Sequence, residues 1–282
     1  MNGGVDLYLL AGVKTWPTYF REPAERLKAM SIEAGYADAD VHVLYPYGDH
    51  TIPLHRQLRE VTRDVARRLA LAADNLQPAI DRLGDLQMEA AGEYASAEGS
   101  PRHGAAAQPA EPRSSAVEAP AEPIVEAIRE RSAGRVVVLI GHSGGGVAAY
   151  HAGRRLLAEG AVRDCRIVQI GSPKVRIHPA LRDRTAYFYA TDERGRIRDP
   201  ITRLGTWGGI RKAAAGIPVW DSRRWAPGHI AAITIDGGHK DYFQLGPSGA
   251  AAKTTNLERT AAAVLDWLVR SLRPVRPPSP AQ

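Results

Sequence analysis

A run of apolar, mostly β-branched residues that stops at a glycine-rich turn constrains the fold of this chain more than any other feature. Residues 135–140 read RVVVLI, and residues 141–145, GHSGG, follow directly. A continuous apolar run of this kind is typical of a strand buried on both faces, as in a parallel sheet. The pattern becomes helical from residue 147, so we expect a strand, a tight turn and a helix in succession.

The same alternation of short apolar runs and helical spacings extends over most of the chain. We expect further strands over residues 7–11, 41–45, 166–170, 185–190 and 230–235, and helices over residues 23–34, 54–76, 147–158 and 255–272. Strands that alternate with helices favour an α/β fold, with a mostly parallel sheet covered by helices on both faces. We expect one domain over residues 1–273.

Two segments fall outside this pattern. Residues 88–123 consist almost entirely of Ala, Glu, Pro, Ser, Gly and Arg. Such a segment buries too little apolar surface to offset its ordering entropy, so we interpret it as a disordered or loosely helical insertion. Residues 274–282 are proline-rich and are expected to form a disordered tail.

Charge and composition exclude several classes of protein. The chain has 37 Lys and Arg against 31 Asp and Glu, a net charge of +6, but the charges are dispersed, which argues against nucleic-acid binding. No segment approaches the ~20 apolar residues of a transmembrane helix. The single Cys165 excludes an intrachain disulfide, and no spacing of possible ligands indicates a metal site. The N-terminus lacks a basic segment typical of signal peptides, so we expect a cytoplasmic protein; nothing indicates an oligomeric state.

The glycine-rich turn carries the clearest chemical signal. It matches G-x-S-x-G between a strand and a helix, the context in which this motif forms a nucleophile elbow. Glycine is needed at Gly141 and Gly145 because side chains there would clash, and Ser143 would stand above the sheet edge as a nucleophile. The Gly144 N–H would lie at the helix N-terminus, where it favours an oxyanion. The alternatives are a turn without a catalytic role and a dinucleotide loop, although the next strand lacks the acidic residue that the latter requires.

A serine nucleophile needs a base and an acid that orients it. His239, in a glycine-rich loop just after the last expected strand, is our preferred base over His229, which begins that strand. Asp192 and Asp199 both follow the strand over residues 185–190. The residues alone leave the choice between them open, and the unused aspartate would cap a turn.

Several motifs taken together resemble a known family. The GHSGG turn, residues 171–175 (GSPKV), residues 199–204 (DPITRL) and the loop of His239 resemble the serine lipase and esterase branch of the α/β-hydrolase superfamily, most closely class 3 lipases. The resemblance implies hydrolysis of a small acyl ester or thioester without a cofactor, and Asp199 as the acid. The sequence departs from this family in two ways: the expected sheet starts without the preceding N-terminal hairpin, as in the smaller hydrolases, and the insertion at residues 88–123 has no family counterpart.

The loop after the first strand and the tryptophans complete the expected site. Gly12 would let the chain turn so that the Val13 N–H serves as the second oxyanion donor, although an ordinary loop is the alternative. Trp16, Trp207 and His142 are expected to contact substrate. Residues 205–228 form either a lid over the site or a plain surface excursion.

Two other functions are compatible with the same residues. The chain could be a catalytically silent binding module that keeps the fold without the activity. It could also be a transacylase, which uses the same serine and differs in the acceptor that attacks the acyl-enzyme.

Overall fold

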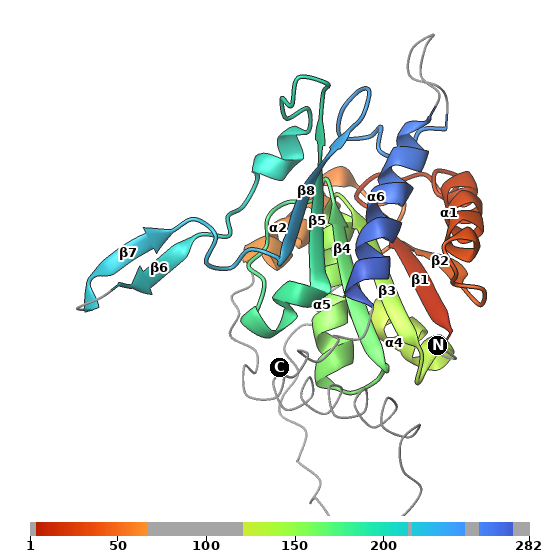
Figure 1. The fold of residues 1–282 in the computed structure, drawn as a ribbon, viewed down its shortest axis with the longest axis horizontal. Helices are drawn as coiled ribbons and strands as arrows, with labels where there is room; N and C mark the ends of the chain where they lie inside the picture. Colours follow the sequence, from red (N-terminus) through yellow and green to blue (C-terminus); the bar gives the residue numbers. More distant parts are fainter. Residues whose placement is uncertain (1–3, 67–120, 214–215, 246–253, 273–282) are drawn as a thin grey trace, which may run out of the picture.

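The structure, a computed structural model, describes residues 4–66, 121–213, 216–245 and 254–272. At its centre lies a six-stranded sheet in the order β2-β1-β3-β4-β5-β8 (Figure 1). All neighbouring strands are parallel, so their carboxyl ends meet at one edge. The strands are β1 (Val5–Leu10), β2 (Asp40–Leu44), β3 (Val136–His142), β4 (Asp164–Ile170), β5 (Thr185–Thr191) and β8 (His229–Thr234). The predicted α/β fold with a mostly parallel sheet is confirmed.

Helices cover both faces of this sheet. One apolar core joins the sheet to α2 (Leu54–Ala66), α4 (Ala121–Ser132) and α5 (Gly144–Ala158). A second core joins the other face to α1 (Arg21–Glu33) and α6 (Asn256–Ser271), the latter crossing in front of the sheet in Figure 1. No helix in the described residues combines the length and apolar character needed to cross a bilayer.

Strand β3 contributes to both cores because its side chains alternate between the two faces. Val137 and Leu139 lie in the core with α5. Val138 and Ile140 lie in the core with α6. This double burial explains why the strand reads as an unbroken apolar run in the sequence.

Helix α4 was not predicted, and it shows that the expected end of the insertion was wrong. The expected insertion ended at residue 123, but α4 already begins at Ala121. Its apolar residues Ile124, Val125 and Ile128 have helical spacing and are buried in the core that α4 shares with α5, which stabilises the helix. The rest of the expected insertion, residues 67–76 of the expected long helix and the tail at 274–282 lie outside the described residues.

Helix α5 and the segment at 205–228 also differ from expectation. Helix α5 begins at Gly144 instead of residue 147, because glycines carry no helical signal in a sequence pattern. Residues 205–228 contain an antiparallel hairpin of β6 (Gly209–Lys212) and β7 (Pro218–Asp221), which projects away from the sheet in Figure 1. Short 3₁₀ helices, η1 (Pro179–Arg184) and η2 (Pro200–Arg203), flank β5.

The strand order determines where a ligand site belongs. The chain leaves β1 through α1 on one face to reach β2, and then returns past β1 to β3 on the opposite face. The carboxyl ends of β1 and β3 therefore form a topological switch point, where open α/β sheets bind their ligands. The loop that begins at Ala11 and the turn at Ser143 lie there.

Candidate active site

Ser143 occupies a strained turn between β3 and α5. Its backbone angles, φ 56° and ψ −128°, are rare for a residue with a side chain. A Cβ on Gly141 would lie 2.2 Å from the carbonyl oxygen of Gly145, and one on Gly145 would lie 2.1 Å from that of Leu10. The turn therefore requires glycine on both sides of Ser143, as the motif predicted.

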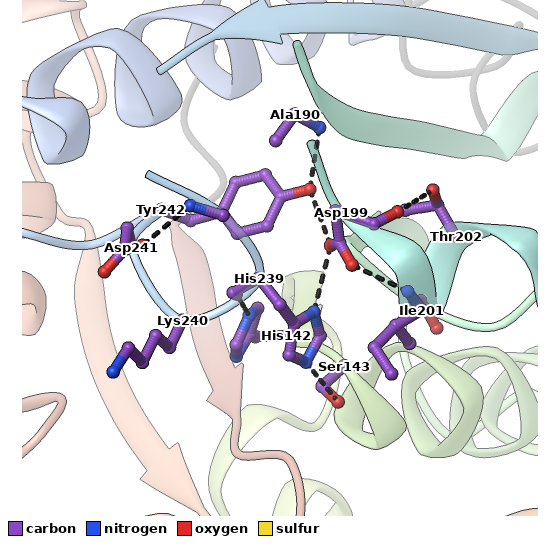
Figure 2. Close-up of polar contacts among 12 residues, drawn as sticks. His142, Ser143, Ala190, Asp199, Ile201, Thr202, His239, Lys240, Asp241 and Tyr242 are labelled. Carbon is purple, nitrogen blue, oxygen red and sulfur yellow. Dashed lines mark hydrogen bonds and ion pairs between the residues drawn. The ribbon is translucent and has the colours of Figure 1, made fainter. Parts of the chain in front are cut away.

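Ser143, His239 and Asp199 form a continuous chain of hydrogen bonds (Figure 2). His239 Nδ1 lies 2.9 Å from Asp199 Oδ2, and His239 Nε2 lies 3.0 Å from Ser143 Oγ. Because a carboxylate only accepts, Nδ1 carries the proton and Nε2 is free to accept from the serine hydroxyl. This arrangement has the distances required of a nucleophile, a general base and its orienting acid.

Asp199 is fully buried, and both oxygens of its carboxylate accept hydrogen bonds. Oδ1 accepts from the Ile201 N–H at 2.9 Å, where Asp199 caps η2. Oδ2 accepts from His239 and, at 2.9 Å, from the Tyr242 hydroxyl. A Cβ on Gly171, which has φ 55°, would lie 2.5 Å from this Oδ2. Glycine at this position therefore makes room for the carboxylate.

Tyr242 is a site residue that sequence reasoning missed. Its hydroxyl donates to Asp199 and accepts from the Ala190 N–H at 2.7 Å. Burial, reinforced by the Asp199 carboxylate, raises the pKa of Tyr242 far above its ordinary value, so the phenol keeps its proton. Its spacing of three residues from His239 was the available signal, but a buried tyrosine is usually only part of a core.

The structure rules out Asp192 as the partner of His239. The Asp192 carboxylate accepts from the backbone N–H groups of Arg194 and Arg196 and from the Arg196 side chain. These hydrogen bonds lower the pKa of Asp192, and the bond from the Arg196 backbone N–H has the largest effect. It therefore caps a turn after β5, as expected of the unused aspartate. His229 begins β8, at the sheet edge opposite Ser143, where it stacks on Trp267.

The loop after β1 approaches Ser143 as expected. A Cβ on Gly12 would lie 2.7 Å from Ser143 Cβ and 3.2 Å from its Oγ. The Thr15 hydroxyl donates to the Gly12 carbonyl at 3.0 Å and fixes this turn. Val13 and Gly144 both line the cavity above Ser143, where oxyanion donors are required.

Gln57 in α2 supports this loop and was not predicted. Its side chain is fully buried, and its Oε1 accepts from the Lys14 N–H at 2.9 Å. Its Nε2 donates to the carbonyls of Tyr47, Gly48 and Asp49. A polar residue on the buried side of an amphipathic helix was the signal that pointed to such a role.

His142 contacts the base more extensively than expected of a substrate-binding residue. Its ring stacks on His239, with centroids 4.9 Å apart, and its Nε2–H donates to the His239 carbonyl at 2.8 Å (Figure 2). Burial lowers the pKa of His142 to about 4, so the ring is neutral at pH 7. His142 also lines the cavity, as predicted.

A largely apolar cavity of about 630 Å³ lies over Ser143 and His239. Trp16 lines it, is 63% exposed and stacks on His50 with ring centroids 3.9 Å apart. Trp207 was expected there but is buried against Tyr187, and it is not among the lining residues. Of the described residues in 205–228, Gly205 alone lines the cavity, so a lid function of this segment stays a prediction.

Comparison with known proteins adds no family assignment. The sequence matches no model of a known protein family and no curated protein. Within the part of the chain that the structure describes, no group of three or more His, Cys, Asp or Glu side chains is placed to hold a metal ion.

Proposed function

We propose that this protein is a serine hydrolase that cleaves carboxylic esters or thioesters through an acyl-enzyme. The observation that carries the proposal is the unbroken hydrogen-bond chain Ser143–His239–Asp199, which ends in an apolar cavity. Asp199 is buried while His239 remains 27% exposed, so the base reaches the cavity and the acid is shielded from water.

In the proposed first half-reaction, Ser143 Oγ attacks the acyl carbonyl carbon while His239 Nε2 takes the hydroxyl proton. The N–H groups of Gly144 and Val13 stabilise the tetrahedral oxyanion. Collapse of the intermediate breaks the bond to the alcohol or thiol, which takes the proton from His239 and leaves. Ser143 then carries the acyl group as an ester.

In the second half-reaction, His239 removes a proton from water as the water oxygen attacks the acyl carbonyl. Collapse of this second intermediate releases the carboxylic acid and returns the proton to Ser143 Oγ. Asp199 keeps the imidazole in the tautomer with its proton on Nδ1 and stabilises the imidazolium that forms in both halves. The neutral His142 ring stacked on His239 adds no opposing charge.

We further propose membership of the α/β-hydrolase superfamily, near the lipase and esterase branch. Three features support this proposal: the parallel strand order, the elbow after β3, and an acid after β5 followed by a histidine after β8. The reduced N-terminal hairpin stays a prediction.

Labelling with a fluorophosphonate probe tests the nucleophile directly. Wild-type protein should be labelled at Ser143 and should hydrolyse a short p-nitrophenyl ester. Ser143→Ala should lose labelling and lower kcat by up to about 10⁶-fold while its unfolding curve stays unchanged. Equal hydrolysis by this variant would refute the proposal, and an unlabelled, inactive wild type would indicate a silent binding module. Transfer of the acyl group to an added alcohol in preference to water would identify a transacylase.

A further inference from the structure

Lys14 shares a positive backbone φ with the proposed nucleophile. Among the described non-glycine residues, only Lys14 (φ 54°) and Ser143 (φ 56°) have a positive φ. Such a conformation costs about 1–3 kcal/mol and persists only where the surroundings impose it, which is most often at a functional site. Both residues line the same cavity.

The surroundings of Lys14 hold both its backbone and its side chain. The backbone N–H donates to Gln57 Oε1 at 2.9 Å, and Nζ donates to the His50 carbonyl at 2.8 Å. An ammonium has three N–H donors, so this neutral partner leaves donors for a ligand. Lys14 forms no ion pair with any described residue, whereas Lys28 lies 3.0 Å from the Asp40 carboxylate.

The described residues that line the cavity around Lys14 carry no negative charge. Its described lining includes two lysines, Lys14 and Lys240, and no Asp or Glu. Figure 2 shows the Lys240 side chain extending away from Ser143. Lys14 belongs to the turn at Gly12, which packs against Ser143, and its Nζ is held at the His50 carbonyl.

The described lining of the cavity is mostly apolar, and both of its lysines are exposed. Leu58, Val61 and Val65 of α2 form one apolar wall, and Pro173, Ile201 and Leu204 form another. Lys14 and Trp16 are exposed, as are Leu58 and Leu204 at the outer ends of the walls, whereas Val61 is buried. An acyl chain would be buried between the apolar walls, whereas a charged group would remain at the mouth because burying it unpaired is costly.

We propose that Lys14 binds an anionic group on the alcohol or thiol half of the substrate, so that the preferred substrates are esters with an apolar acyl chain and a negatively charged head group. This inference rests on the proposed hydrolase function. Lys14 acts here as a specificity residue, and the ammonium contributes to binding without a part in the bond-breaking steps.

A pair of esters that differ only in charge tests the proposal. The hexanoyl esters of 3-hydroxybenzoate and 3-hydroxybenzamide have the same acyl chain and a similar leaving group, and only the first is anionic. Wild-type protein should favour the anionic ester in kcat/KM after correction for the intrinsic hydrolysis rates. Lys14→Met should lower kcat/KM for the anionic ester roughly ten-fold more than for the neutral one. The preference of the wild type should also weaken as salt is added.

Two further variants provide the controls. Lys14→Arg keeps the charge and should keep most of the preference. Lys212→Met removes a charge from the exposed strand β6, outside the cavity, and should leave kcat/KM for both esters unchanged. A thermal melt of each variant shows that it is folded.

The outcomes separate this inference from the proposed function. If Lys14→Met leaves the ratio of kcat/KM for the two esters unchanged, Lys14 does not recognise the head group and the inference is wrong. The labelling of Ser143 and the hydrolysis of the neutral ester would still support the hydrolase. A wild type that hydrolyses neither ester and resists the phosphonate probe would overturn the hydrolase and this inference together.

Discussion

At the scale of single residues, the hydrogen bonds around Asp199 determine how well His239 is oriented. The serine, histidine and aspartate were each predicted, because a strand–turn–helix motif and positions after strands are local features of the sequence. Tyr242 was not predicted as a partner of Asp199, because that contact depends on how the loop after β8 packs against the N-terminus of η2. The sequence resemblance favoured Asp199 over Asp192, and the geometry explains the choice: only Asp199 points at the imidazole.

Replacing Tyr242 by Phe tests the role of this phenol. The change removes a donor to a buried carboxylate, so we expect kcat to fall roughly ten-fold with little change in KM. The Ala190 N–H also loses its acceptor, which should cost about 1–3 kcal/mol of stability.

The matched control is Tyr187→Phe, measured by ester hydrolysis and urea unfolding. The buried Tyr187 hydroxyl donates to the Ser172 carbonyl, and among the described residues it makes no hydrogen bond to Asp199. This variant should lose similar stability and keep its kcat. Equal losses of kcat in the two variants would contradict a specific role of Tyr242.

At the scale of secondary-structure elements, periodicity predicted the strands of the sheet and four of its helices. It missed α4 because the apolar face of this helix is short and directly follows a segment whose composition predicts disorder. It missed the β6–β7 hairpin because four-residue strands with exposed side chains lack a clear alternation of burial. The position of Trp207 was predicted wrongly for a related reason. A tryptophan in a glycine-rich segment can line a cavity or be buried in a core, and here it packs on Tyr187.

The junction of β3 and α5 predicts a sharp difference between two glycine substitutions. In Gly145→Ala the new Cβ would meet the Leu10 carbonyl of β1 at 2.1 Å, and backbone cannot move aside as a side chain does. We expect a loss on the order of 4 kcal/mol or more in the free energy of unfolding.

Gly160→Ala is the comparison. Gly160 has φ 63° and open space around a Cβ, so only the backbone strain of about 1–2 kcal/mol applies. Urea unfolding measures both variants. Similar losses would mean that the close approach of α5 to β1 does not require glycine at position 145.

At the scale of the whole molecule, the parallel topology assembles a site from distant parts of the chain. Gly12, Ser143, Asp199 and His239 follow β1, β3, β5 and β8, and the register of the sheet brings all four to one edge. Strand alternation in the sequence was enough to predict this edge. The side-chain packing that neutralises His142 and anchors Gln57 could not be predicted, because it depends on contacts between elements that no local pattern specifies.

The buried, neutral His142 makes the stability of the molecule depend on pH. Its pKa is about 4 in the folded protein and near 6.5 in an unfolded chain, so in this window the unfolded chain binds a proton that the folded one does not. Stability should therefore fall as the pH drops from about 6.5 to 4, with His142 contributing roughly 3 kcal/mol of the loss.

His142→Gln keeps a donor for the His239 carbonyl and removes the titrating group. As the pH falls, the wild type should lose more stability than this variant, because only the wild type carries the titrating group. The stability of the wild type relative to the variant, measured by urea unfolding at several pH values, should therefore decrease on acidification. A difference that stays constant between pH 7 and pH 4.5 would show that His142 is not the group responsible.

Gln57 has a consequence for how the cavity could open. One amide side chain connects α2 to the turn that carries Gly12 and Val13 and, through three carbonyls, to the chain that leaves β2. The same helix supplies the Leu58 and Val65 wall. A displacement of α2 that widened the entrance would also release the Lys14 amide and loosen the turn that carries Gly12 and Val13. In the proposed hydrolase, access to the cavity and the placement of the oxyanion donors would therefore depend on the same side chain.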